Sequence, residues 1–126
     1  MDFEDQDRLV CHLICLSAAY LVTPMYEDAR EALIEAEDEL AELDKWMIAL
    51  SHGLPDPMCR HLILRAALYY NASVLFFETG DLELGVHYLT HARENLSRVT
   101  SRSDMSRPLY ASVDAVVSAL EAQMTR

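Results

Sequence analysis

Glycine and proline are scarce in this chain, with 3 glycines and 4 prolines among 126 residues, whereas hydrophobic residues make up 52%. Disordered chains and all-β domains with many tight turns use more of both residues. Their scarcity therefore argues against such a chain and predicts an all-α fold of long helices joined by short loops. A chain of 126 residues is long enough for one hydrophobic core but not for two, so we expect a single domain over residues 1–126.

Positive charge is also scarce, because 10 Lys and Arg stand against 21 Asp and Glu and give a formal net charge of -11. Such a chain would repel phosphate backbones and anionic lipid surfaces, so nucleic acid is not an expected partner. More than half of the acidic residues precede Lys45. The run Glu35–Glu39 is interpreted either as a solvated helix face or as a surface that meets a basic partner.

Cysteine is rare, and the three thiols, Cys11, Cys15 and Cys59, include no C-x-x-C pair. Three thiols cannot all pair within one chain, so we expect reduced cysteines in a cytosolic protein. Cys11 and Cys15 stand among Leu and Ile and are expected to be buried, with raised pKa values. The N-terminus is acidic where a secretory signal would be basic, and the apolar run Leu9–Val22 is too short to span a bilayer. The prediction is a cytoplasmic protein without membrane insertion.

Hydrophobic periodicity predicts about five antiparallel helices. They are expected at about Asp5–Val22, Pro24–Leu50, Asp56–Thr79, Asp81–Leu96 and Pro108–Met124. Thr23 and Asp81 are the expected N-caps of the second and fourth helices. The first and third helices show almost no polar face, and a helix that is apolar all round must be covered on every side.

Two predicted hairpins, Val10–Glu42 and Ala66–Arg98, place small and bulky residues at the same relative positions. When Leu13 is paired with Tyr69, the matched pairs are Ser17 with Ser73, Tyr20 with Phe76, Ala29 with Gly85, Leu33 with Leu89 and Ala36 with Ala92. This spacing resembles the tetratricopeptide repeat, in which small residues let two antiparallel helices approach closely. The offset between the copies is longer than the 34 or so residues of tandem repeats, and the closing proline is missing. A generic pair of helical hairpins therefore stays open as an alternative.

The resemblance implies an array with an apolar concave groove, lined by the first helix of each hairpin. The matching positions here are Cys11, Ile14, Ala18, Leu21 and Val22 in the first hairpin and Tyr70, Val74 and Phe77 in the second. Almost none of them is polar, so the expected occupant is an amphipathic helix of another protein. The alternative is that these residues form the ordinary core of a self-contained helical bundle.

Size, acidity and architecture together resemble one group of helical chaperones, those of the needle subunit in bacterial type III secretion. The resemblance implies a non-catalytic chaperone or adaptor that keeps an aggregation- or polymerisation-prone partner soluble and monomeric. It also implies a heteromeric complex with the secretion needle subunit and a small helical co-chaperone, and hence a part in protein transport and virulence. This function needs no cofactor and no catalytic residue.

The strongest candidates for chemistry are His87 and His91, four residues apart on one predicted helix, with Glu83 and Glu94 about one turn away. That spacing can hold a metal ion, so a regulatory or metal-binding helical bundle is the alternative function. The sequence has no second Glu-x-x-His motif of the kind that a di-iron bundle requires, and neither a glycine-rich phosphate loop nor a nucleophile turn. We therefore expect neither a metal site nor an enzyme.

Overall fold

The computed structural model describes residues 3–50, 55–99 and 107–124. These ranges contain five helices and no strand: α1 (Phe3–Val22), α2 (Tyr26–Leu50), α3 (Pro55–Glu78), α4 (Leu82–Ser97) and α5 (Arg107–Met124). The all-α class and the five helices predicted from the sequence are confirmed. Within the same ranges, no helix has the length and the apolar character that crossing a membrane requires.

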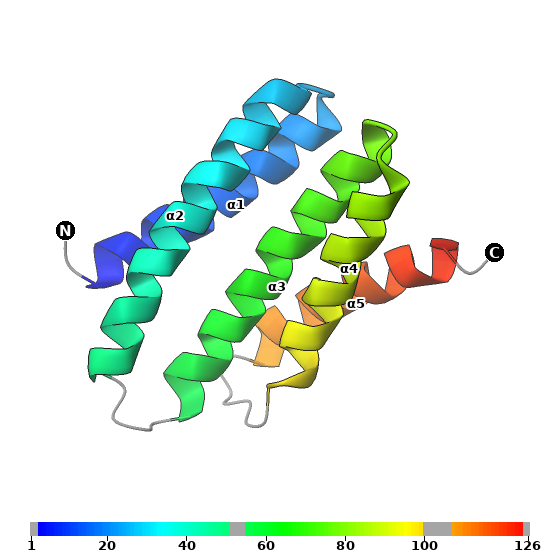
Figure 1. Cartoon of the computed structure of the whole chain (residues 1–126). Coiled ribbons are helices and arrows are strands. Elements are labelled where there is room, and N and C mark those ends of the chain that lie inside the picture. The colour runs from blue at the N-terminus through cyan, green and yellow to red at the C-terminus, as the bar shows by residue number, and fades with distance from the viewer. Residues whose placement is uncertain (1–2, 51–54, 100–106, 125–126) are drawn as a thin grey trace.

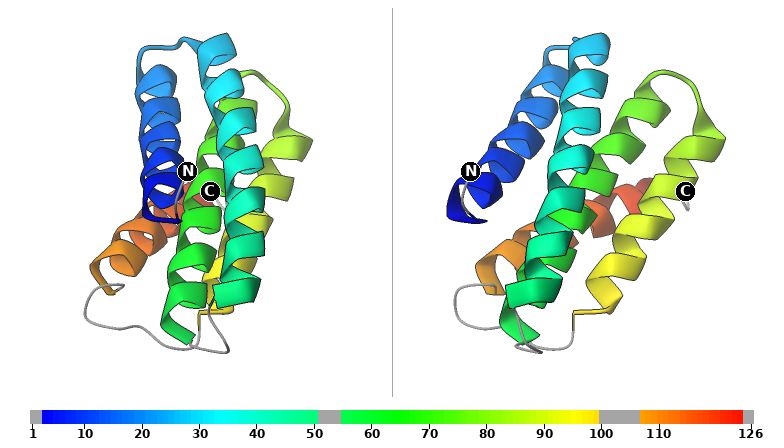
Figure 2. Two further views of the ribbon diagram at one scale, coloured as in Figure 1. Left: turned by 90° about the vertical axis from the view of Figure 1, so that its left-hand side faces the viewer. Right: turned by 60° about the vertical axis from the view of Figure 1, so that its left-hand side comes forward.

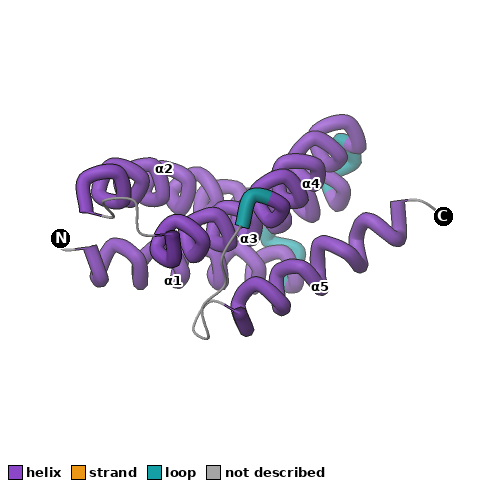
Figure 3. Tube along the Cα trace, turned by 90° about the horizontal axis from the view of Figure 1, so that it is seen from below, coloured by secondary structure: helices purple, strands orange, loops and turns teal. Residues whose placement is uncertain are grey.

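The five helices form two antiparallel hairpins and one oblique helix (Figure 1). Helices α1 and α2 pack along their length, and so do α3 and α4. Helix α3 is central, because it contacts each of the other four helices. Figure 3 shows α2 and α4 on one side of α3, with α1 and α5 on the other. Helix α5 crosses the second hairpin obliquely, as the two views of Figure 2 show, and it packs on both α3 and α4.

The two hairpins repeat one burial pattern at the positions matched in the sequence. Ser17 and Ser73 are fully buried, and each hydroxyl donates a hydrogen bond of 2.7 Å to the backbone carbonyl three residues earlier. The small and bulky pairs are buried alike: Ala29 with Gly85, Leu33 with Leu89, and Ala36 with Ala92. Both hairpins thus bury residues of similar size at these positions.

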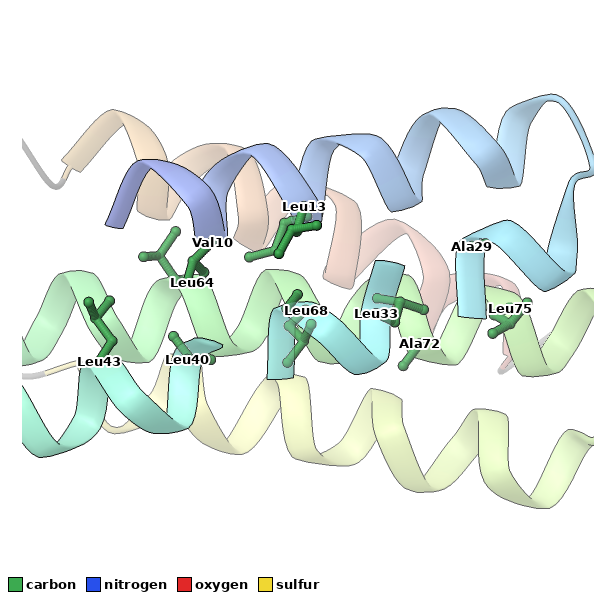
Figure 4. Packing of buried hydrophobic residues seen from close by; sticks show 12 residues of the cluster. Val10, Leu13, Ala29, Leu33, Leu40, Leu43, Leu64, Leu68, Ala72 and Leu75 are labelled. Carbon is green, nitrogen blue, oxygen red and sulfur yellow. The ribbon is translucent and has the colours of Figure 1, made fainter. Parts of the chain in front are cut away.

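Buried side chains form two clusters that share α3. The first joins α1, α2 and α3 through residues such as Leu13, Leu40 and Leu68, which point toward one another in Figure 4. The second joins α3, α4 and α5 through residues such as Ile63 and Leu96. Because α3 contributes to both clusters, it links the first hairpin to the rest of the molecule.

Polar side chains fix how α1 sits on α3. The buried amide of Asn71 donates hydrogen bonds of 3.0 Å to the Ile14 carbonyl and to the Ser17 hydroxyl. Arg60 donates two hydrogen bonds, of 3.1 and 2.7 Å, to the carboxylate of Asp7. A buried polar group that loses its partner costs roughly 1–3 kcal/mol, so these bonds select one arrangement of the two helices.

One cation joins α4 to α5 in a similar way. The Arg93 guanidinium donates to Asp114 at 2.7 Å, to Ser118 at 2.9 Å and to Glu121 at 2.8 Å. Planar guanidinium groups make geometrically specific bonds of this kind with carboxylates. The oblique position of α5 therefore depends on polar contacts as well as on its apolar stripe.

The two hairpin turns differ in how well the sequence predicted them. Gly80 has a φ of 90°, which favours glycine, and the Asp81 carboxylate accepts a hydrogen bond from the Leu84 amide at 3.1 Å. The expected N-cap at Asp81 is confirmed. The expected N-cap at Thr23 is wrong, because its hydroxyl donates back to carbonyls at the end of α1 and α2 begins only at Tyr26.

Candidate binding channel

An open, mainly apolar pocket of about 250 Å³ lies between α2 and α4, with α3 as its floor. We call it the apolar pocket; it is lined by Arg30, Leu33, Ile34, Glu37, Leu68, Tyr69, Ala72, Leu75, Phe76 and Tyr88. The buried floor belongs to the first core cluster, so it is held rigidly. Helices α2, α3 and α4 all face the viewer in Figure 1.

The walls of the apolar pocket carry aromatic and aliphatic side chains that solvent reaches. The Tyr88 ring of α4 stacks on Phe76 with centroids 5.4 Å apart, and its centroid is 5.8 Å from that of Tyr69. On the opposite wall, Ile34 of α2 is 55% exposed. Aromatic pairs fixed in this way offer a large contact area at low entropic cost. The pocket is therefore suited to apolar side chains of a partner.

A second, polar pocket of about 440 Å³ is lined by the same three helices. Its lining residues are Asp44, His61, Leu62, Arg65, Tyr69, His91, Glu94, Asn95 and Arg98. We call it the polar pocket. Tyr69 lines both pockets, so they are neighbours along α3, and we call the two together the channel.

A carboxylate organises the floor of the polar pocket. The Asp44 carboxylate lies 2.7 Å from Nδ1 of His61 and pairs with the guanidinium of Arg65. Burial lowers the pKa of His61 below its ordinary value, although the charge of Asp44 opposes this shift. His61 is therefore neutral at pH 7.

Two buried polar atoms of this pocket have no hydrogen-bond partner in the described part of the chain. They are Nε2 of His61 and Oδ1 of Asn95, and each residue is 5% exposed. The other polar atom of each side chain has a neighbour: Nδ1 of His61 lies 2.7 Å from Asp44, and Nδ2 of Asn95 donates to the His91 carbonyl at 2.8 Å. Buried groups of this kind are nearly always paired, so these two atoms are exceptions in the described part of the chain.

The residues predicted to line a concave groove do not line either half of this channel. Ile14 belongs to the first core cluster, and Cys11 and Leu21 pack against it. Tyr70 and Phe77 pack against the second cluster. The remaining three differ in exposure, since Ala18 and Val74 are half-buried whereas Val22 is 82% exposed.

The rest of the described chain does not cover α1 on every side. Helix α1 packs on α2 and α3, and it leaves Cys15, Ala19 and Val22 exposed on its outer face. Cys15 was expected to be buried, so that prediction is corrected as well. Cys11 is half-buried, and burial together with the nearby Asp7 carboxylate raises the pKa of its thiol as expected.

The histidine pair considered for metal binding is close in space. The imidazole centroids of His87 and His91 are 4.4 Å apart. In the ranges that the structure describes, no cluster of three or more His, Cys, Asp or Glu side chains is arranged to hold a metal ion. His91 instead lies beside Tyr69, with centroids 5.7 Å apart, on the wall of the polar pocket.

Some of the residues that line the channel were named from the sequence, but not as a binding surface. Tyr69 and Phe76 were singled out only as matched positions of the two predicted hairpins, and Asp44 is one of the many acids that precede Lys45. Arg65, Tyr69, Ala72 and Phe76 follow one another at steps of four, three and four, which places them on one face of α3. This face was not distinguished from the core, because periodicity alone does not show which apolar face stays open. Comparison with protein-family models, with curated proteins and with solved structures found no match.

Proposed function

We propose that this protein is a non-catalytic chaperone or adaptor that holds an amphipathic helix of a partner protein in the channel between α2 and α4. The observation that carries the proposal is the apolar pocket, with the exposed Ile34 on one wall and the stacked rings of Phe76 and Tyr88 on the other. Helices bind grooves of this kind through apolar residues spaced three and four apart.

The energetics favour a partner that buries this surface. Removing apolar surface from water contributes about 25 cal/mol per Å², and fixed aromatic anchors at the centre of an interface commonly carry most of the affinity. Ordering of both helices offsets part of this gain. The floor of the apolar pocket is already ordered, because Leu33, Leu68 and Leu75 belong to the core. This protein therefore loses less conformational entropy on binding.

The outer face of α1 is the second candidate surface. It includes Val22, one of the residues that the sequence predicted to line a groove, and its neighbours Cys15 and Ala19 are also exposed. This surface has fewer aromatic side chains open to solvent, so the channel is preferred.

The first client to test is the one that the sequence resemblance implies. In the proposed role, the channel would cover the amphipathic helix through which a needle subunit polymerises, and a small helical co-chaperone would complete the heteromeric complex. The mechanism is steric masking, since the covered helix is no longer available to a second subunit. The proposal needs no bond making or breaking and no cofactor.

The experiment is co-expression of the chain with the small proteins encoded beside it, followed by size-exclusion chromatography with light scattering. Two matched variants then locate the interface: Ile34→Gln on the channel and Val22→Gln on the outer face of α1. Both residues are exposed aliphatic side chains on helices, so neither change is expected to disturb folding.

We expect a discrete complex whose affinity falls about tenfold or more with Ile34→Gln, because an unpaired amide would replace a buried aliphatic contact. Val22→Gln should leave the affinity unchanged. If Val22→Gln weakens the complex and Ile34→Gln does not, the interface lies on the outer face of α1, which includes the predicted residue Val22. A monomer that forms no complex with any neighbour would refute the proposed function.

A further inference from the structure

Two opposite charges stand on one wall of the apolar pocket. Among the described residues that line it, only Arg30 and Glu37 are charged, and both belong to α2. Both residues are exposed. Within the described ranges, neither side chain forms a hydrogen bond or an ion pair. The α2 wall therefore presents one free cation and one free anion beside an apolar surface.

The two charges follow the apolar seam of α2. The seam is buried and alternates steps of four and three residues, through Ala29, Leu33, Ala36, Leu40 and Leu43. Arg30 and Glu37 each directly follow a seam residue and stand seven positions apart. In coiled coils, charged residues beside an apolar contact decide which partner helix binds and in which direction. The same physics applies to a helix in the channel, because these charges lie beside its apolar contact.

The charges mark two separate levels along the channel. Seven residues of a helix make two turns and span about 10 Å, and the exposed Ile34 lies between the two levels. Asp44 follows Glu37 by another seven positions, but its carboxylate is already paired with Arg65. The opposite wall carries uncharged rings, so the free charges face only one edge of a bound helix.

We propose that the helix held in the channel carries an acidic residue opposite Arg30 and a basic residue opposite Glu37, two turns apart on one edge of its apolar face. This inference rests on the proposed function and names the charge chemistry of its partner. A helix with two acids or two bases on that edge would meet a like charge at one level. Two opposite charges are therefore the arrangement that this wall accepts at both levels.

The order of the two charges also sets the direction of the bound helix. Arg30 precedes Glu37 in α2, so a helix whose acid precedes its base runs parallel to α2. A helix with the base first runs antiparallel to it. Exposed ion pairs add little affinity, about threefold for a good pair, so the apolar contact holds the helix and the charges select its orientation.

The test uses designed amphipathic helical peptides of about 18 residues. They share one apolar face, made symmetric so that either direction of binding is sterically possible. They differ only at two edge positions seven residues apart, which hold Glu then Lys, two Glu or two Lys. Binding to the full chain is measured by titration calorimetry at about 0.15 M salt, where a Debye length of about 8 Å leaves mainly the local pairs.

We expect the Glu-Lys peptide to bind the natural chain about threefold or more tightly than either like-charged peptide. Glu37→Lys should make the two-Glu peptide the tightest ligand, and Arg30→Glu should do the same for the two-Lys peptide. Asp38→Lys is the matched control, because it makes the same charge change at an exposed neighbour that lines neither pocket. It should leave the order of the three peptides unchanged. All three variants alter exposed residues, so none is expected to disturb folding.

The direction of binding is a second readout, and a general electrostatic attraction would not produce it. A nitroxide label at the N-terminus of the Glu-Lys peptide should broaden amide resonances near Arg30 in the natural chain. In the double variant Arg30→Glu/Glu37→Arg, the same peptide should bind with similar affinity but in the reverse direction. The broadening should then move to the polar pocket.

Three results would each overturn the inference and leave the proposed function standing. They are equal affinities of the three peptides, an order that Asp38→Lys changes as much as Glu37→Lys does, and an unchanged direction in the double variant. Failure of every peptide to bind would contradict the proposed function and the inference with it. A dimer of the chain alone that Ile34→Gln dissociates would make a second copy the occupant of the channel, which also overturns the inference.

Discussion

Gly85 allows α4 to approach α3 closely, and replacing it with alanine tests whether this approach holds the second hairpin together. An added Cβ would lie 2.5 Å from Cδ1 and Cε1 of the Phe77 ring and 2.9 Å from Cγ. Overpacking of this kind costs roughly 1–3 kcal/mol. Alanine in a helix otherwise gains about 1 kcal/mol over glycine, so the net change in Gly85→Ala should be a loss of about 1 kcal/mol.

The measurement is urea unfolding, followed by circular dichroism, of four proteins: the natural chain, Gly85→Ala, Phe77→Leu and the double variant. With the ring removed, the steric cost of the added Cβ disappears and only the helix preference is left. Gly85→Ala should therefore lower the free energy of unfolding in the natural chain and raise it in the Phe77→Leu background. If alanine stabilises both backgrounds equally, the close approach of α3 and α4 is not a constraint and the reasoning is refuted.

The other predictions concern thiol reactivity and pH. Iodoacetamide at pH 8 should label the exposed Cys15 first and Cys59, which is 2% exposed, last, with labelling at each thiol followed by peptide mass spectrometry; faster reaction of Cys59 would contradict its burial. The lowered pKa of His61 means that the unfolded chain binds its proton first as pH falls, so the free energy of unfolding should decrease from about pH 7 to below the ordinary pKa of 6.5. His61→Gln should flatten this decrease in urea titrations, whereas the exposed His87→Gln should not.

Much of the fold followed from short-range patterns. The small residues Ala29, Ala36 and Ala92 were expected where helices approach closely, and all three are fully buried. Asp81 was recognised as an N-cap because its carboxylate reaches the free amides of the next turn. Thr23 has the same capping chemistry, but its hydroxyl is used by α1. Sequence alone does not decide between two neighbouring helix ends that compete for one side chain.

The channel could not be predicted in the same way, because it depends on how the two hairpins lie against each other. Tyr69 is one apolar residue among many in α3, and nothing in its spacing shows that it lies at the junction of an apolar and a polar pocket. Asp44, His61 and Arg65 come from two helices and meet only after the hairpins pack. Long-range placement of this kind is not contained in helical periodicity.

The difference between the hairpins suggests why the channel lies beside α4. Ala29 of the first hairpin has a Cβ, whereas its counterpart Gly85 has none and leaves room for the Phe77 ring. Phe77 packs into the second core cluster, while the neighbouring ring of Phe76 lies on the channel side and stacks on Tyr88. The glycine thus lets two adjacent aromatic residues serve the core and the channel separately. By this argument, a variant that displaces Phe77 would also disturb the wall on which a partner helix is proposed to rest.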